Sequence, residues 1–71
     1  MSEQVKPGWY IRLENEYSEL RNKIYKLRVF INSEKFENIS SSSQHLLTTQ
    51  LLVMKQYLNV LEERIFTDTY E

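Results

Sequence analysis

The chain has 71 residues, with nine Lys and Arg, ten Asp and Glu and one His, and a net charge of -1. This length has room for one small domain. The lack of Cys excludes disulfide frameworks and thiolate metal sites, and no apolar run approaches the roughly 18 residues of a membrane span. One Gly and one Pro are too few for the turns of an all-β domain. No basic-then-apolar signal peptide opens the chain, so we expect a small, cytoplasmic, mostly helical protein.

The first predicted helix spans residues 9–31. Pro7 and Gly8 are helix breakers, so residues 1–8 are expected to form a flexible tail. No Gly or Pro follows before residue 32, and the apolar residues are spaced by four and three, which places them on one helical face. They are Leu13, Tyr17, Leu20, Ile24, Leu27 and Ile31.

A short connection follows the first helix. Asn32 and Ser33 favour a turn, because their side chains compete for backbone hydrogen bonds. Ser33 could cap one helical turn over residues 34–38. Phe36 and Ile39 would then cover the closed end of a hairpin.

The second long helix is predicted to begin in the serine run at residues 40–43. Ser41 and Gln44 have the spacing of a capping box. The apolar stripe that follows repeats the spacing of the first helix: Leu47, Leu51, Met54, Leu58, Leu61 and Ile65. The helix should end near Phe66, which leaves residues 67–71 as a frayed tail and residues 9–66 as the helical hairpin domain.

Two long helices with a short connection should fold back antiparallel. Counting outward from the connection pairs Ile31 with Leu47 and Leu13 with Ile65, so the stripes form the core. The second helix has further apolar residues beside its stripe: Leu46, Leu52, Val53, Tyr57 and Val60. A chain of this size buries only about 60% of its unfolded surface. We therefore predict an all-α antiparallel hairpin that assembles into a homo-oligomeric helical bundle, at least a dimer. The alternative is a monomer that binds another protein through the same patch.

Charge is unevenly distributed. Residues 6–33 contain six basic and three acidic side chains, and residues 34–71 contain three basic and six acidic ones. Arg21, Tyr25 and Arg28 share one helical face. Two guanidinium groups beside an aromatic ring suit a ligand with phosphates and a base, because Arg donates paired hydrogen bonds to phosphate and Tyr offers a stacking surface. The alternative is a basic, solvated helix face without a ligand.

No group of residues predicts catalysis, a metal site or a cofactor. His45 is the single His, and no Cys accompanies it. Glu62 and Glu63 are adjacent and so do not share a helical face, as a catalytic carboxylate pair would. Asp68 is the single Asp, and one Gly excludes a Gly-rich phosphate loop. The two adjacent glutamates also argue against binding of duplex nucleic acid. We expect a binding protein and not an enzyme.

The runs ELRNKIYKLRVFINSEKF and LLTTQLLVMKQYLNVLEERI resemble a widespread group of small phage proteins. The likeness covers residues 17–66, and its informative polar and aromatic members are Lys23, Phe30, Ser33, Phe36, Gln50, Tyr57 and Arg64. The resemblance implies a viral sponge of the anti-CBASS type. Such a sponge is a helical oligomer in the cytoplasm of the bacterial host. It binds a cyclic dinucleotide such as cGAMP without cleaving it and so blocks antiviral signalling.

The resemblance also implies ligand residues on both helices. Together with the basic face, and with two neighbours of Arg64 in the antiparallel pairing, the expected set is Arg64, Tyr57, Lys23, Gln50, Tyr25, Arg21, Arg28, Tyr10 and Arg12. Alternatively, Lys23 and Arg64 pair with Glu19 and Glu16, and Tyr57 belongs to the core. The functional alternatives are direct inhibition of a host or defence protein, or a helical assembly accessory.

Overall fold

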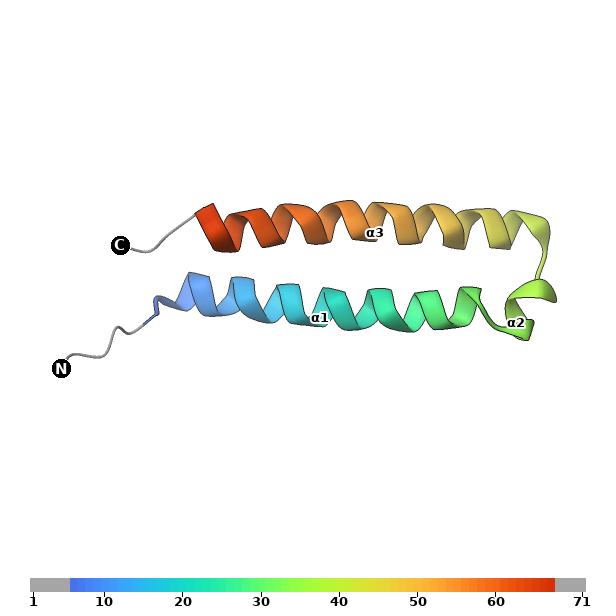
Figure 1. Cartoon of the computed structure of the whole chain (residues 1–71), viewed down its shortest axis with the longest axis horizontal. Coiled ribbons are helices and arrows are strands. Elements are labelled where there is room, and N and C mark those ends of the chain that lie inside the picture. Colours follow the sequence, from blue (N-terminus) through green and yellow to red (C-terminus); the bar gives the residue numbers. More distant parts are fainter. Residues whose placement is uncertain (1–5, 68–71) are drawn as a thin grey trace.

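The computed structural model describes residues 6–67, which form a helical hairpin (Figure 1). Its helices are α1 (Gly8–Ile31), α2 (Glu34–Glu37) and α3 (Ser41–Thr67). α1 and α3 lie side by side and antiparallel, and α2 lies at the closed end (Figure 1). The predicted all-α hairpin with a short helical connection is confirmed, while its assembly into an oligomer remains a prediction.

α1 begins one residue earlier than predicted. Pro7 is its N-cap residue, with an extended backbone, and the Pro7 carbonyl accepts hydrogen bonds from the backbone N–H groups of Tyr10 and Ile11 at 3.0 and 3.1 Å. Lys6 forms an ion pair with Glu14 at 3.0 Å, so the chain contacts α1 before the helix starts. Of the predicted tails, residues 1–5 and 68–71 lie outside the described residues.

The connection after α1 is held by side-chain hydrogen bonds to the last carbonyls of the helix. Asn32 donates through Nδ2 to the Arg28 carbonyl at 2.9 Å, and the Ser33 hydroxyl donates to the Phe30 carbonyl at 2.6 Å. Ser33 precedes α2 as predicted, but its side chain does not cap that helix. The rings of Phe30 and Phe36 meet edge to face, with centroids 6.2 Å apart, so Phe36 covers the closed end as predicted.

The start of α3 corrects one prediction, because the capping box of Ser41 and Gln44 does not form. Ser40 is the residue before the helix, and its Oγ accepts a hydrogen bond from the Ser43 backbone N–H at 3.1 Å. Gln44 instead donates through Nε2 to the Phe36 carbonyl at 2.8 Å. That carbonyl lies at the end of α2, where it also accepts a long hydrogen bond from the Ile39 backbone N–H at 3.4 Å. Gln44 therefore ties α2 to α3.

The core runs along the contact between α1 and α3. Its buried members are Leu13, Leu20, Ile24 and Leu61, with Tyr17, Leu51, Met54, Leu58 and Ile65 packed against them. All of these come from the two predicted stripes, which therefore face each other. Leu61 is the most enclosed member, with 0% of its surface exposed.

Many large apolar side chains remain exposed on the hairpin. They are Trp9, Ile11, Tyr25, Val29, Leu46, Leu52, Val53, Tyr57, Val60 and Phe66. Most of them belong to α3. One face of α3 packs against α1, and apolar side chains are also exposed on its other faces. Exposed apolar surface of this extent marks interaction sites. No helix within residues 6–67 is long and apolar enough to cross a membrane.

Candidate ligand-binding site

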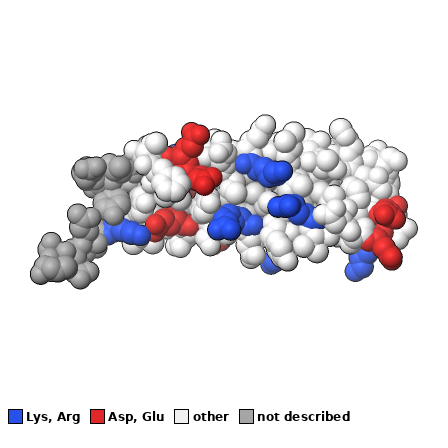
Figure 2. All heavy atoms as spheres, in the orientation of Figure 1, with Lys and Arg blue, Asp and Glu red and all other residues white. Residues whose placement is uncertain are grey.

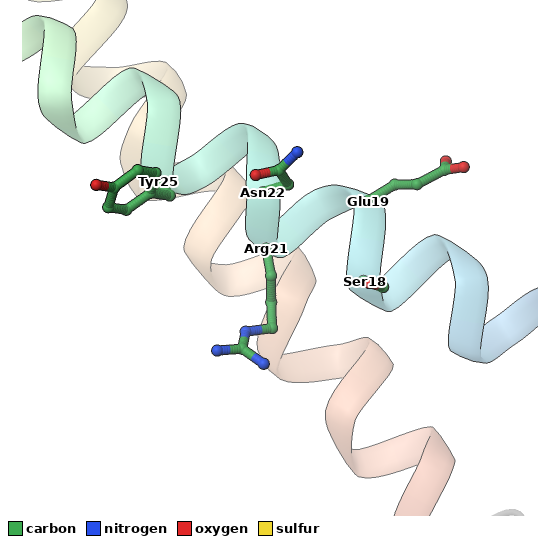
Figure 3. A pocket seen from close by; sticks show the side chains of 5 residues that line it. All are labelled: Ser18, Glu19, Arg21, Asn22 and Tyr25. Carbon is green, nitrogen blue, oxygen red and sulfur yellow. The ribbon is translucent and has the colours of Figure 1, made fainter.

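Arg21, Tyr25 and Arg28 lie on one face of α1, as predicted. Tyr25 is 65% exposed and stands between two shallow depressions, each with one of the arginines. The first has a volume of about 450 Å³ and is lined by Ser18, Glu19, Arg21, Asn22 and Tyr25 (Figure 3). The second has a volume of about 530 Å³ and is lined by Tyr25, Arg28, Val29, Asn32 and Ser33. Tyr25 thus lines both depressions, and each depression also contains one arginine.

The two arginines of this face have no ion-pair partner among the described residues. The Arg21 guanidinium lies 5.9 Å from the Tyr17 ring centroid, a cation–π contact. Glu19 points away from Arg21 (Figure 3), and within residues 6–67 no carboxylate forms an ion pair with Arg21 or Arg28. Figure 2 shows Lys and Arg side chains gathered over the middle of the hairpin, with Asp and Glu nearer its ends. The middle of the hairpin can therefore attract an anion.

Lys23, Gln50, Tyr57 and Arg64 lie on the other flank of the hairpin. The Tyr57 hydroxyl donates a hydrogen bond to the Glu16 carboxylate, which fixes these two residues on the same flank. On α1, Lys23 follows Glu16 by one heptad and so shares its face. On α3, Gln50 lies one heptad before Tyr57 and Arg64 one heptad after it, so these three also share a face. Arg21, two residues before Lys23, points about 200° away around α1. The structure therefore separates the two groups of predicted ligand residues.

The residues of this second flank are spread along the hairpin. Gln50 and Arg64 are separated by roughly 21 Å along α3. Glu16 lies beside Tyr57. Because the helices are antiparallel, one heptad forward on α1 corresponds to one heptad back on α3, so Lys23 lies beside Gln50. Gln50 Nε2 lies 3.7 Å from the Met54 sulfur. Within one chain, Lys23 and Arg64 are too far apart for their cationic ends to meet on one phosphate.

The contact with Glu16 governs the chemistry of Tyr57. It raises the pKa of the Tyr57 hydroxyl above its ordinary value, because the hydrogen bond to the carboxylate holds the proton. Partial desolvation and the negative charge of Glu16 raise the pKa further, whereas Arg64 lowers it. Tyr57 is 44% exposed and so is not a core residue. It stays a protonated donor at neutral pH and offers an open ring face.

Of the two alternative ion pairs on this flank, the one between Lys23 and Glu19 does not form. Glu16 is bonded to Tyr57, and Lys23 forms no ion pair with Glu19 or any other residue in the described range 6–67. Lys23 therefore keeps its charge available for a ligand.

Tyr10, one of the predicted ligand residues, is buried in the core. Only 9% of it is exposed, its hydroxyl donates to the Ile65 carbonyl at 3.4 Å, and Lys6 Nζ lies 5.4 Å from its ring centroid. A ring enclosed in this way cannot stack on a base. Arg12 is exposed beside the start of α1, where its Nη1 lies near Gly8.

Three residues of these surfaces were not predicted. Ser18 and Asn22 line the first depression beside Arg21, and Glu16 holds the Tyr57 hydroxyl. The spacing of Ser18, Asn22 and Tyr25 by four and three residues was a usable signal, because it places them on one helical face. The bond between Glu16 and Tyr57 had no such signal, since it depends on how the two helices are aligned.

The chemistry that these residues offer is binding. Guanidinium and ammonium groups can pair with phosphates, and exposed Tyr rings can stack on bases. Within residues 6–67, no group of three His, Cys, Asp or Glu side chains is placed to hold a metal ion. His45 is exposed at the start of α3.

Comparison with known proteins places this chain among small phage proteins. A family model described as Sequestin matches residues 7–67. The chain is also 43% identical over 58 residues to an uncharacterized 7.5 kDa protein of the denB–rIIB intergenic region of Enterobacteria phage T4, a match that covers 82% of this chain and 91% of that protein. No solved structure matches. The matches indicate no enzyme family.

Proposed function

Because the chain belongs to the Sequestin family, we propose that it is a phage counter-defence protein that sequesters a nucleotide immune signal. The ligand is a cyclic dinucleotide such as cGAMP, which the protein binds without cleaving. Binding removes the signal from the cytoplasm of the bacterial host and blocks CBASS-type defence. The observation that carries this proposal is the exposed Tyr25, which lines one depression together with Arg21 and another together with Arg28.

The chemistry of a cyclic dinucleotide fits this face. The ligand has two phosphates and two bases. Arg21 and Arg28, separated by roughly 10 Å along α1, supply two forked donors for the phosphates. Tyr25 between them supplies a stacking surface, and stacking on an aromatic ring contributes about 1–3 kcal/mol per base. Ser18 and Asn22 add hydroxyl and amide groups that can bond a base edge or a ribose.

The second flank supplies a further set of ligand residues in a homo-oligomer. Lys23 and Arg64 are cations, Gln50 is an amide, and Tyr57 combines a ring with a protonated hydroxyl. Arg12 lies on α1 toward the same end of the hairpin as Arg64. A protein that sequesters its ligand one-to-one needs high affinity for that ligand and no group that breaks its bonds. The hydrogen-bond donors and aromatic rings of this flank agree with such a role.

Ligand binding is tested directly by calorimetry and thermal shift with cGAMP, cyclic di-AMP and cyclic di-GMP, with ATP as the control for nonspecific anion binding. We expect a raised Tm with at least one cyclic dinucleotide and recovery of the intact nucleotide after denaturation. Tyr25→Ala and Arg28→Gln should weaken binding at this face at least tenfold, since each removes a group worth more than about 1.4 kcal/mol.

Two variants of α1 residues that line neither depression serve as controls. Ile11→Ala removes an exposed apolar side chain of α1, and Lys26→Gln removes an exposed cation. Neither should change affinity by more than about twofold. The proposal fails if no cyclic dinucleotide shifts the Tm at concentrations far above micromolar, or if the recovered nucleotide is cleaved.

A second candidate function is inhibition of a host or defence protein by direct binding. It is favoured by the exposed apolar side chains of α3, including Leu46 at 65% and Val53 at 56%. This function predicts a stable complex with one host protein that survives gel filtration. It also predicts loss of that complex when Val53 is replaced by Glu, with nucleotide binding absent.

A further inference from the structure

α3 has a second stripe one residue behind its core stripe. Moving each member of the core stripe back by one residue gives Leu46, Gln50, Val53, Tyr57, Val60 and Arg64. One residue corresponds to about 100° around an α-helix, so this second stripe lies beside the contact with α1 and not within it. Its alternate spacing of four and three residues is that of a coiled-coil seam.

The second stripe is exposed and apolar at every seventh residue. Leu46, Val53 and Val60 are 65%, 56% and 51% exposed, and Tyr57 is 44% exposed. Moving the core stripe forward by one residue gives the opposite side of α3: Thr48, Leu52, Lys55, Asn59, Glu62 and Phe66. That side is mostly polar and lacks the repeat. The apolar excess of α3 is therefore one-sided and has the periodicity that a second helix requires.

We propose that the second stripe pairs with the same stripe of a second copy of this chain, antiparallel, about a twofold axis near residue 55. In this register Leu46 faces Arg64 of the second copy, Gln50 faces Val60, and Val53 faces Tyr57. Every pair is reciprocal, so the interface is self-complementary and closes as a dimer. The two hairpins then form a four-helix bundle with α3 of each copy at its centre.

Charge favours the antiparallel arrangement. A parallel pairing would place Arg64 against Arg64 of the second copy within the seam, whereas the antiparallel one separates these two cations by roughly 27 Å. Opposed helix dipoles also favour it. Beside the seam, Gln56 faces Gln56 of the second copy, and Glu63 faces Thr49, so no like charges meet. The Arg64 stem can pack on Leu46 while its guanidinium reaches the rim.

The pairing brings together ligand residues that one chain holds apart. In the proposed register, Gln50 of the second copy lies roughly 6 Å along the axis from Arg64 and about 4.5 Å from Tyr57. Lys23 of the second copy stands beside that Gln50. The dimer thus has two equivalent sites, each with Tyr57 and Arg64 from one copy and Lys23 and Gln50 from the other. This composite site rests on the proposed function, whereas the helix pairing does not.

Site-directed crosslinking tests the pairing and its direction. The chain has no Cys, so each introduced thiol is unique. Thr49, Gln56 and Glu63 are exposed and occupy equivalent heptad positions beside the second stripe. With a short bismaleimide, Gln56→Cys should form covalent dimers. In a dimer of Thr49→Cys alone, or of Glu63→Cys alone, the two thiols are roughly 21 Å apart along the axis and should not crosslink. Covalent dimers should form when these two variants are mixed.

The crosslinking outcomes separate the possible occupants of the stripe. Asn22→Cys on α1 is the control for random collision and should not crosslink. Equal crosslinking of all three α3 variants would indicate a parallel dimer and overturn the proposal. Crosslinking no greater than that of the control would show that something other than a second copy covers the second stripe, which also overturns it.

A matched pair of variants tests the seam by mass. Val53 and Leu52 are neighbours on α3 and are both 56% exposed, but only Val53 belongs to the second stripe. Val53→Glu should convert the protein to a single 8.6 kDa chain in sedimentation at micromolar concentration, with its helical circular dichroism retained. Leu52→Glu should stay dimeric. Equal behaviour of the two variants would overturn the assignment of the seam.

Mixing of two inactive variants tests the composite site. Both variants are made in a Tyr25→Ala background, so that binding at the Tyr25 face does not mask the composite site. In that background Arg64→Ala and Lys23→Ala should each weaken the remaining binding of the cyclic dinucleotide at least tenfold. Mixed dimers have one intact site, made of Arg64 from one variant and Lys23 from the other. After random exchange the mixture should recover roughly a quarter of the binding capacity of the Tyr25→Ala parent. No recovery would overturn the composite site while wild-type binding still supports the proposed function, and a wild type that binds no nucleotide would overturn both.

Discussion

The Tyr57 hydroxyl on α3 donates a hydrogen bond to the Glu16 carboxylate on α1. The bond joins the two long helices outside their apolar core, on the flank that also holds Lys23 and Arg64. It exists only while the phenol is protonated, because a phenolate would lose the bond and face a second negative charge. The pKa of Tyr57 is therefore raised above its ordinary value, and any stability that the bond contributes is present below that value and lost as pH rises through the raised pKa.

The first prediction concerns this titration. The difference in tyrosinate absorbance between the wild type and Tyr57→Phe isolates Tyr57 from the other tyrosines. We expect its midpoint above the ordinary value of 10.0, because the proton is held by Glu16. Glu16→Gln removes the negative charge and should move the midpoint down. A midpoint that is at or below the ordinary value in the wild type, or unchanged in Glu16→Gln, would contradict the observed contact.

The second prediction concerns Leu61, which is fully enclosed by the core. Leu61→Ala leaves a cavity and should lower the free energy of unfolding by about 2–5 kcal/mol, most of what a core of this size provides. Leu61→Met nearly conserves volume and should lose less than about 1.5 kcal/mol. Urea unfolding at one fixed protein concentration measures both, since association would otherwise shift the midpoint. Leu52→Ala, at an exposed position of α3, is the control and should be nearly neutral.

The third prediction concerns the cap of α3. The Ser40 Oγ accepts the Ser43 backbone N–H at 3.1 Å, so Ser40→Ala should lower the free energy of unfolding by about 1 kcal/mol. Ser42 is exposed within the first turn of α3 and has no such bond within the described residues. Ser42→Ala should therefore leave stability unchanged or slightly raised, since Ala favours helix. Thermal unfolding compares the two, and equal losses would place the cap elsewhere.

The helices and their stripes could be predicted because spacing by three and four residues is a property of each helix alone. Features that depend on contact between helices were harder to predict. Four serines in a row offer several caps, and the choice of Ser40 follows from Gln44 being drawn back to the Phe36 carbonyl. Tyr10 was expected near a ligand, but alignment of the helices carries its hydroxyl to the Ile65 carbonyl. The spacing of residues within one helix does not determine how the two helices align.

The predicted ligand residues show the same division. Arg21, Tyr25 and Arg28 share a face because all belong to α1. Lys23 and Arg64 belong to different helices, and their distance along the hairpin follows from the antiparallel alignment and the length of the connection. Spacing within each helix could place both on one flank, but it could not show that a single chain holds them roughly 21 Å apart along the axis.

The last prediction concerns Gln44, which links α2 to α3. Its Nε2 donates to the Phe36 carbonyl at 2.8 Å and to the Ile39 carbonyl at 3.4 Å. Gln44→Met keeps the side-chain length but removes the donor, so these carbonyls lose a partner. We expect a loss of about 0.5–1.5 kcal/mol in the free energy of unfolding.

The same substitution should also loosen the connection locally. The backbone N–H groups of Phe36, Asn38 and Ile39 bond within the connection at 3.1 to 3.4 Å, and their hydrogen exchange should quicken in Gln44→Met more than that of amides in the middle of α1. Gln56→Met, at an exposed position of α3, should leave these amides unchanged. If both variants exchange as the wild type does, the closed end is held by the contact of Phe30 with Phe36 and not by Gln44.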